Sequence, residues 1–191
     1  MTPEKLENLE KLLTAKFPSL PLEREIEALV LRVEPEQLVA TMTQLRDDAD
    51  LDFKLMIDIA GVHYPDREKP LEAVYQLLSV RKNHRIRIKV SIAEETPIPS
   101  IISVWTCANW FEREAYDMLG IRFSNHPDLR RILNEYEFDG HPLRKDFPLI
   151  GKVEMRYDEK LGRVVREPID MSPNDIEPFK RGDRESYPQS S

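Results

Sequence analysis

The feature that most constrains the fold is the strict alternation of apolar and polar residues in RIRIKVSI, residues 85–92. Every second position is apolar, namely Ile86, Ile88, Val90 and Ile92. Side chains of a strand point alternately to its two faces, so this period predicts a strand with one buried and one solvated face. The chain must therefore contain a sheet that packs one face on a core.

Two apolar segments upstream predict further strands. Leu71–Arg81 follows Phe53–His63, one face of which is predicted to carry Phe53, Leu55, Ile57 and Ile59. Short loops at Tyr64–Pro70 and Lys82–His84 join these segments to residues 85–92. Because short loops connect antiparallel neighbours, the three strands are predicted to form a meander.

Helical spacing of apolar residues predicts helices over Pro3–Lys16 and Pro35–Asp47, with a short strand over Glu25–Val33 between them. A helix, a strand, a second helix and three strands in this order indicate an α+β fold. We predict an N-terminal domain over residues 1–104, in which helices pack a mostly antiparallel sheet.

The second half of the chain has a different character. Asn109–Leu119 is predicted to be a helix, with Asn109 and Glu112 forming a capping box and Gly120 ending it. We assign residues 105–133 to this helix and the following turn. Residues 134–191 carry scattered apolar side chains without a period, so they are too apolar for a solvated tail. We predict that they form an extended arm that docks on another protein.

Composition excludes several classes of protein. The formal charge of −7 argues against a general binder of nucleic acid or anionic lipid. The longest apolar run, residues 28–31, is too short to span a bilayer. The single cysteine, Cys107, excludes an internal disulfide and a cysteine-ligated iron–sulfur cluster, and its apolar neighbours predict a small buried residue.

Histidines and carboxylates are the candidate catalytic groups. His126 and His141 lack the close spacing of metal ligands, and each precedes a proline, where a histidine more often fixes a turn. Glu114 and Asp117 are three residues apart, a spacing that suits an acid–base pair. A small enzyme that uses Glu114 with His126 or His141 is therefore the alternative from a different class.

Basic residues in the second half are better explained as ion-pair partners. Arg113 lies among the helix carboxylates, and Arg130-Arg131 and Arg144-Lys145 are interleaved with acids such as Asp146. This mixture favours a salt-bridge network over catalysis or nucleic-acid binding. Taken residue by residue, the sequence predicts a binding or structural protein without its own cofactor.

Two motifs resemble one known family. EREAYDMLGIRFSNHPDLRRIL at residues 112–133 and GHPLRKDFPL at residues 140–149 are similar to the C subunit of respiratory complex I, the 30 kDa subunit family. The segments IDIAGVHYP, VYQLLSV and RIRIKV also resemble its N-terminal domain. The charged residues of the two motifs are predicted to form a structural ion network and comprise Glu112, Arg113, Glu114, Asp117, His126, Arg130, Arg131, His141, Arg144, Lys145 and Asp146.

The resemblance implies a non-catalytic subunit of the hydrophilic arm of proton-pumping NADH:quinone oxidoreductase, which braces and assembles the quinone-reducing module. It implies no cofactor in this chain, with FMN, iron–sulfur clusters and quinone held by neighbours. The expected partners are the complex I subunits D, B and I, in a hetero-oligomer peripheral to the inner membrane. The bacterial cytoplasmic face and the mitochondrial matrix face both remain open. An equivalent subunit of a membrane-bound hydrogenase or a ferredoxin:quinone reductase is the related alternative.

Overall fold

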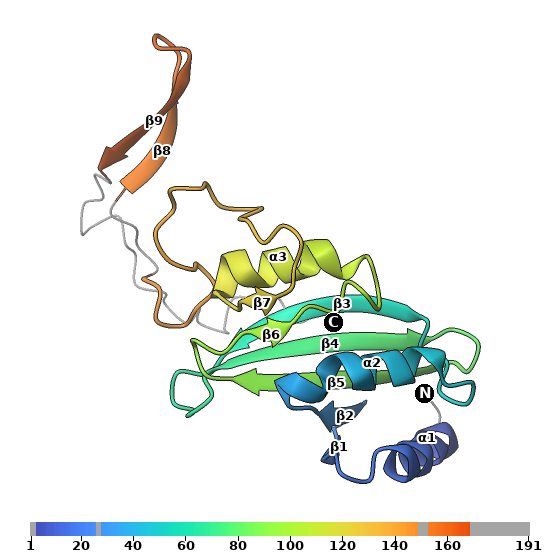
Figure 1. Ribbon diagram of the computed structural model, residues 1–191. Helices are drawn as coiled ribbons and strands as arrows, with labels where there is room; N and C mark the ends of the chain where they lie inside the picture. The colour runs from blue at the N-terminus through green and yellow to red at the C-terminus, as the bar shows by residue number, and fades with distance from the viewer. Residues whose placement is uncertain (1–2, 26–27, 149–152, 169–191) are drawn as a thin grey trace, which may run out of the picture. The chain divides into compact units, whose positions relative to one another are not determined.

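The computed structural model describes residues 3–25, 28–148 and 153–168 (Figure 1). The chain divides into two compact units, Met1–Phe147 and Pro148–Ser191. The first unit contains a five-stranded sheet of order β1-β2-β5-β4-β3. Its strands are β1 (Leu22–Arg24), β2 (Leu29–Arg32), β3 (Leu55–His63), β4 (Leu71–Ser79) and β5 (His84–Ile92).

The sheet confirms the predicted α+β fold and the meander. β3, β4 and β5 pair antiparallel in chain order, and β1 pairs antiparallel with β2. β2 joins the other edge of β5 in parallel, so the sheet is mixed but mostly antiparallel. The helical elements are α1 (Pro3–Lys16), the 3-10 turn η1 (Pro35–Gln37), α2 (Leu38–Asp47) and α3 (Ala108–Leu119).

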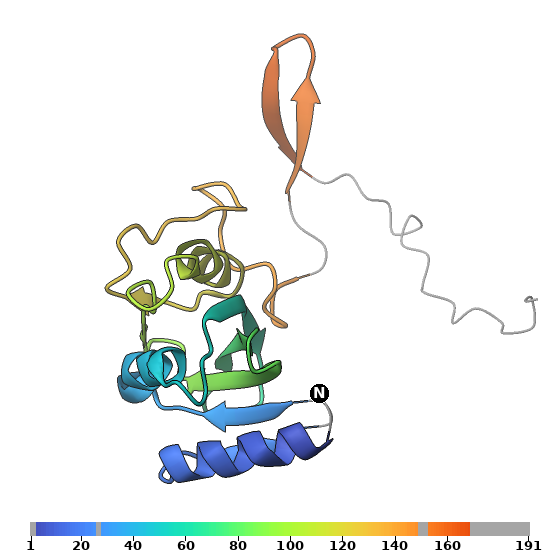
Figure 2. The same cartoon turned by 90° about the vertical axis from the view of Figure 1, so that its right-hand side faces the viewer.

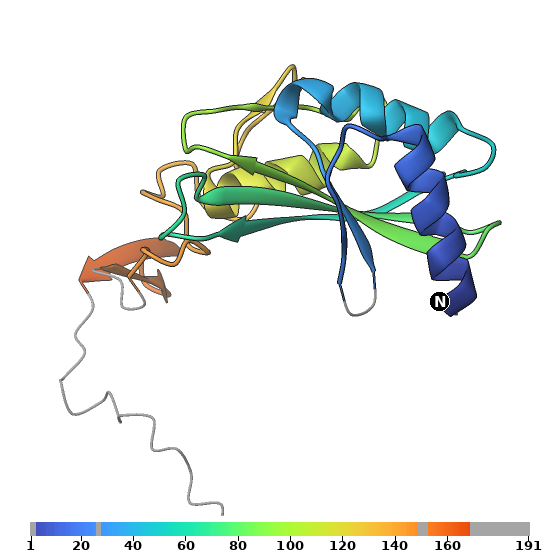
Figure 3. The ribbon, with the colours of Figure 1, turned by 90° about the horizontal axis from the view of Figure 1, so that it is seen from below.

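One face of the sheet supplies the core. The alternation in β5 has the predicted outcome, since all four of its apolar side chains are buried, namely Ile86, Ile88, Val90 and Ile92. α1 lies beside β1 and β2 (Figure 2), while α2 and α3 cover the apolar face (Figure 3). The predicted inner positions of α2 are buried as well, namely Leu38, Met42 and Leu45.

β3 departs from the predicted alternation. A β-bulge between Met56 and Asp58 shifts its pairing with β4. The extra residue puts Met56, before the bulge, and Ile59, after it, on the same buried face, whereas Leu55 and Ile57 are exposed. The prediction that Leu55 and Ile57 share a face with Phe53 in the core was wrong: the bulge places Ile59 on the face of Met56, and Phe53 precedes β3 and is outside its alternation.

Two further local predictions need correction. The strand predicted over Glu25–Val33 is shorter, and β2 pairs with β1, a strand that the sequence did not predict. The predicted capping box is absent: the N-cap of α3 is Cys107, which is exposed rather than buried, and Glu112 turns inward. The end of α3 is as predicted, because Gly120 has φ of 81° and closes the last turn.

The packed core extends beyond residue 104. α3 packs on β3, and its apolar residues belong to the same hydrophobic cluster as the sheet. The short strand β6 (Ile98–Pro99) pairs in parallel with β7 (Phe123–Ser124), and α3 lies between them in the chain. The predicted division after residue 104 therefore does not coincide with a boundary between packed units.

Part of the predicted arm has regular structure. β8 (Val153–Asp158) and β9 (Arg163–Pro168) form an antiparallel hairpin in the second unit. Its pairing places Tyr157 opposite Val164, with Met155 and Val153 on the same face, and all four side chains are more than half exposed. Residues 169–191, the end of the predicted arm, lie outside the described residues.

Candidate functional site

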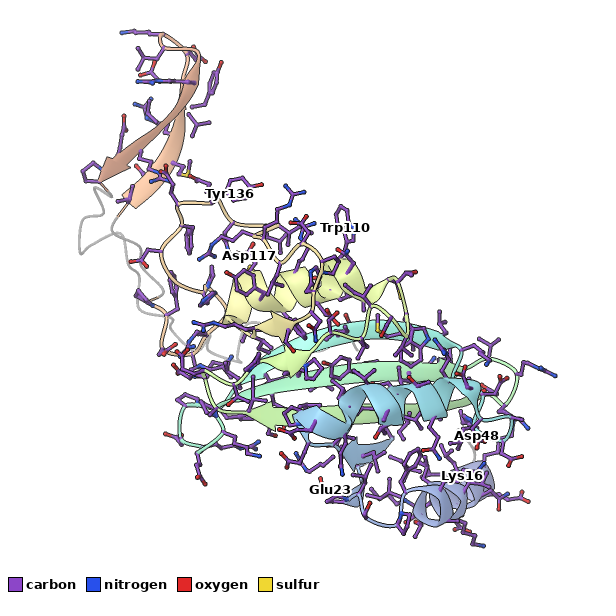
Figure 4. The ribbon with its side chains drawn as sticks, viewed as in Figure 1. Lys16, Glu23, Asp48, Trp110, Asp117 and Tyr136 are labelled. Atoms are coloured by element: carbon purple, nitrogen blue, oxygen red, sulfur yellow. The ribbon has the colours of Figure 1, made fainter. Side chains whose placement is uncertain are left out.

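α3 carries four of the eleven charged motif residues, and its sides meet different surroundings. Ala108, Glu112, Ala115 and Leu119 recur at helical spacing and face the sheet, so Glu112 interrupts an otherwise apolar stripe. Asp117 is also buried, but it meets the loop that follows β7 (Figure 4). The helix therefore buries two carboxylates in two different environments.

The carboxylate of Asp117 organises the loop after α3. Oδ2 accepts hydrogen bonds from three successive backbone N–H groups, at 3.0 Å from Ile132, 2.7 Å from Leu133 and 2.8 Å from Asn134. Oδ1 accepts from Nη1 of Arg131 at 2.7 Å and from the side-chain amide of Asn134 at 3.0 Å. The loop is thus folded around a single buried anion.

These bonds determine the charge state of Asp117. Burial raises the pKa of the carboxyl, but the hydrogen bonds from Asn134, Leu133 and Arg131 outweigh burial and hold the pKa well below its usual range. The ionised carboxylate offers about four lone-pair directions, and the chain's own donors occupy them. The arrangement suits a structural anchor and leaves no free oxygen for proton transfer.

The second motif block packs against the same helix end. Nδ1 of His141 donates to the carbonyl oxygen of Asp117 at 2.9 Å, and the backbone N–H of Leu143 donates to the carbonyl of Met118 at 3.0 Å. The backbone N–H of Lys145 donates to Nδ1 of His63 in β3 at 3.0 Å. Residues 141–145 therefore connect the end of α3 to the main sheet.

Arg144 connects this block to another loop. Its guanidinium donates to Glu94 and, through Nε at 3.1 Å, to Asp146. Both carboxylates are exposed, while the Arg144 side chain is mostly covered. The Lys145 side chain itself is exposed, so its backbone rather than its charge takes part in the contact.

Glu112 lies in the interior without an ion-pair partner of fixed charge among the described residues. Oε1 accepts from the backbone N–H of Ile101 at 2.8 Å, whereas Oε2 has no hydrogen-bond partner in that part of the chain. Burial raises the pKa of Glu112 to about 7, although hydrogen bonds from Ser100 and Ile101 act in the opposite direction. The hydroxyl of Tyr75 is likewise buried, and burial together with the charge of Glu112 raises its pKa.

His126 lies beside Glu112 rather than Glu114. Its Nδ1 accepts a hydrogen bond from the N–H of Asp128 at 3.0 Å, so the proton resides on Nε2, which donates to the carbonyl of Asn109 at 3.1 Å. Nε2 is 4.0 Å from Oε2 of Glu112. Glu114 is exposed and has no ion-pair contact with either histidine in the part of the chain that the structure describes. The acid–base pairs considered for a small enzyme are therefore not brought together.

The arginines of the motif form local contacts of different kinds. Arg113 donates to the carbonyl oxygens of Arg130 and Arg131, at 3.2 and 3.3 Å, and not to a carboxylate among the described residues. Arg130 pairs with Asp128 at 2.8 Å in an exposed bridge. Of the predicted members of one ion network, all of them described, only Asp117 and Arg131 form a buried ion pair of fixed charges.

Two contributors to the site were not singled out from the sequence. Asn134 supplies two donors to Asp117, and Tyr75 lies near Glu112. Ile132 and Leu133 belong to the first motif, but their backbone N–H groups, and not their side chains, bind Asp117. An asparagine after an apolar pair is a signal for a turn, but it does not reveal which carboxylate the turn encloses.

The described ranges contain no group of three His, Cys, Asp or Glu side chains placed to hold a metal ion. Within the same residues, no helix has the length and apolar character needed to cross a bilayer.

Comparison with known proteins identifies the family. The family described as "Respiratory-chain NADH dehydrogenase, 30 Kd subunit" matches residues 31–153, which include α3 and the Asp117 loop. The chain belongs to this family. It is therefore a subunit of a multi-subunit respiratory complex, and the resemblance of the two charged motifs is confirmed.

The relatives agree with this membership. The C subunit of NADH-quinone oxidoreductase from Methylobacterium sp. (strain 4-46) is 58% identical over 144 residues, which cover 75% of this chain and 67% of the relative. The corresponding protein of Azorhizobium caulinodans, also named as the C subunit of NADH-quinone oxidoreductase, is 49% identical over 168 residues, covering 87% of this chain and 80% of the relative.

A solved structure shows a similar fold. One chain from the membrane-bound sulfane sulfur reductase, an archaeal respiratory membrane complex, has a TM-score of 0.64 and 24% sequence identity. The match covers 75% of this chain and 86% of that chain. The fold of the family is therefore found in a respiratory membrane complex of another kind.

Proposed function

We propose that this chain is a non-catalytic subunit that assembles and braces the quinone-reducing module of a proton-pumping NADH:quinone oxidoreductase. The observation that carries the proposal is the use of Asp117. Five donors of the chain's own loop saturate this motif carboxylate, so it builds a surface and does not react with a substrate.

The hairpin of β8 and β9 supports docking on a partner. An isolated two-stranded hairpin is marginally stable in water. One face of this hairpin carries Val153, Met155, Tyr157 and Val164, while the other carries an Arg156–Glu167 ion pair at 2.7 Å. An amphipathic hairpin of this kind gains stability when a neighbouring protein covers its apolar face.

Electron donor, neighbours and membrane face are part of the same proposal. The names of relatives at 49–58% identity support NADH as the donor of the complex and quinone as its acceptor. A single cysteine cannot provide the four thiolates of an iron–sulfur cluster, which supports placing the clusters in neighbouring chains. We propose that FMN and quinone are held in neighbouring chains as well. We propose the complex I subunits D, B and I as these neighbours, with the chain peripheral to the membrane on the bacterial cytoplasmic or mitochondrial matrix face.

The test compares the two faces of the hairpin in cells that lack the natural chain. One variant replaces Met155, Tyr157 and Val164 by serine. The matched control replaces Arg156 and Glu167 by serine, which removes the ion pair but leaves the apolar face intact. Blue-native gels measure the assembled complex, and NADH:quinone turnover is measured per assembled complex.

We expect the apolar-face variant to lower the amount of assembled complex by about tenfold, since a few apolar anchors carry most of an interface's binding energy. Turnover per assembled complex should be unchanged in both variants. Full assembly with lost turnover would contradict a bracing role and would favour participation in the chemistry.

A further inference from the structure

Four side chains lie in a row across α3 and the loop that follows β7; Trp110, Arg130 and Tyr136 are exposed, and Arg113 is half-buried. Trp110 and Arg113 lie one turn apart on α3, with the Arg113 guanidinium 5.7 Å from the centre of the Trp110 ring. The backbone carbonyl of Arg130 accepts from Arg113, and Nη1 of Arg130 donates to the hydroxyl of Tyr136 at 3.4 Å. We name Trp110, Arg113, Arg130 and Tyr136 the aromatic–arginine row; Figure 4 labels its two aromatic ends.

The row exposes large side chains that are nevertheless held in place. Trp110 is 66% exposed and Tyr136 is 73% exposed, whereas the other tryptophan, Trp105, is 7% exposed. Arg113 is fixed by two backbone carbonyls, and Arg130 by Asp128. Fixing these groups before binding reduces the entropy that a partner contact would otherwise cost.

The buried anchor beneath the row explains how the loop keeps its place. Asp117 holds residues 131–134 through Arg131 and three backbone N–H groups, directly between Arg130 and Tyr136 in the chain. The loop therefore presents both residues from a fixed backbone. Asp117 acts here as a positioning residue for an exposed surface.

The charge of the row defines what it fits. Among the described residues, no carboxylate lies within 4.0 Å of the Arg113 guanidinium, and its bonds to carbonyls use Nε and Nη2. Nη1 of Arg113 has no hydrogen-bond acceptor in the part of the chain that the structure describes. A guanidinium beside an aromatic ring, as Arg113 lies beside Trp110, is complementary to a carboxylate with apolar neighbours. Trp, Tyr and Arg are the side chains that dominate the centres of protein interfaces.

We propose that the aromatic–arginine row docks a segment of a neighbouring protein of the complex that places an Asp or Glu carboxylate on Arg113 and apolar side chains on Trp110 and Tyr136. The inference rests on the proposed role of the chain in assembly. It adds a second set of contact residues, different from those of the hairpin of β8 and β9.

The first experiment maps the contact in the assembled complex. A photoreactive benzoylphenylalanine replaces Tyr136 in one strain and Tyr157 of the hairpin in another, and cross-linked peptides are sequenced after irradiation. We expect the probe at 136 to label a peptide of another protein of the complex that contains Asp or Glu. Labelling of a second copy of this chain or of nucleic acid overturns the proposal, and so does labelling of a peptide without a carboxylate.

The second experiment measures retention of the chain in the complex. Trp110→Ala combined with Tyr136→Ala should reduce retention by about tenfold, while Val80→Ala, at a similarly exposed residue outside the row, should leave it unchanged. Arg113→Gln should remove the salt dependence of retention, and Arg113→Lys should preserve it. Unchanged thermal unfolding of the isolated variants distinguishes lost docking from lost folding.

The outcomes separate this inference from the proposed function. If the row variants are retained fully while the apolar-face variant of the hairpin is lost, the row is not a docking surface and the assembly role stands. If the complex assembles without the chain, the proposed function fails, and the docking inference fails with it.

Discussion

Asp117 and Arg131 form a buried ion pair, with Oδ1 and Nη1 separated by 2.7 Å, that ties α3 to the loop after β7. The Nη2 group of Arg131 also donates to the carbonyl oxygen of Gly140 at 3.1 Å. One guanidinium therefore links the helix, the start of the loop and its far end. The loop residues of the aromatic–arginine row, Arg130 and Tyr136, flank the segment that this ion pair holds.

Removing the Asp117 carboxylate should destabilise the chain strongly. Asp117→Ala leaves the buried charge of Arg131 without its counter-ion and three backbone donors without an acceptor, and breaking a buried pair in this way costs about 3 kcal/mol or more. The free energy of unfolding in urea measures the loss. Asp47→Ala, which removes an exposed bridge to Arg46, is the control and should cost less than about 1 kcal/mol. Equal losses in the two variants would contradict the role of Asp117 as an anchor.

The same ion pair should make the free energy of unfolding depend on pH in the acid range. Because the pKa of Asp117 is lowered by folding, its stabilising contribution is present above the ordinary value of 3.8 and is lost as the pH falls toward the folded-state pKa. Wild-type stability should therefore decrease below about pH 4 more steeply than the stability of Asp117→Asn. Parallel curves for the two proteins would show that another carboxyl dominates acid unfolding.

Glu112 should have the opposite effect near neutral pH, where the free energy of unfolding is expected to fall as the pH rises. Its pKa rises from 4.5 to about 7 on folding, so the folded chain keeps a proton that the unfolded chain releases. Stability is lost as the pH rises between these two values, by on the order of 3 kcal/mol in total. Glu112→Gln keeps an acceptor for the N–H of Ile101 and has no such titration, so it should gain stability over wild type from about pH 5 to about pH 8.

Urea unfolding at the two pH values checks the Glu112 prediction. Glu114→Gln is the matched control, because Glu114 lies on the same helix but is exposed. The control should keep the wild-type dependence on pH. A variant at position 112 that retains the full wild-type dependence would rule out Glu112 as the titrating group.

Periodic elements could be predicted from the sequence because their signal is local. The alternation of Ile86, Ile88, Val90 and Ile92 requires one buried face, and the structure buries all four. α1 has the predicted bounds, and α2 continues from a 3-10 turn at Pro35. In each case the burial of one face is encoded in the spacing of neighbouring residues.

Features that depend on non-local contacts could not be predicted in the same way. The bulge between Met56 and Asp58 exchanges the faces of β3 without any Gly or Pro to mark it. The enclosure of Asp117 depends on residues 14 to 17 positions later in the chain, and no period connects them. Glu112 fits the pattern of a capping box, but its side chain lies on the buried face of α3 and so does not cap the helix.

The close approach of α3 to β3 yields a last prediction. A Cβ atom at Gly61 would lie 2.4 Å from Cδ1 of Leu119 and 3.1 Å from Cδ1 of Ile121. Gly61→Ala should therefore push α3 away from the sheet and destabilise the chain by about 1–3 kcal/mol in urea unfolding, as overpacking of a core does. Leu119→Ala alone should also destabilise, because it leaves a cavity.

Combining the two substitutions tests whether the contact itself is responsible. In Gly61→Ala with Leu119→Ala the new methyl group occupies space that the leucine vacated, so the loss should be smaller than the sum of the single losses. Strictly additive losses in the double variant would mean that position 61 requires glycine for the backbone conformation of β3 and not for the close packing of α3. Because α3 carries Glu112, Asp117 and part of the aromatic–arginine row, loosening this contact should also lower the retention of the chain in the assembled complex.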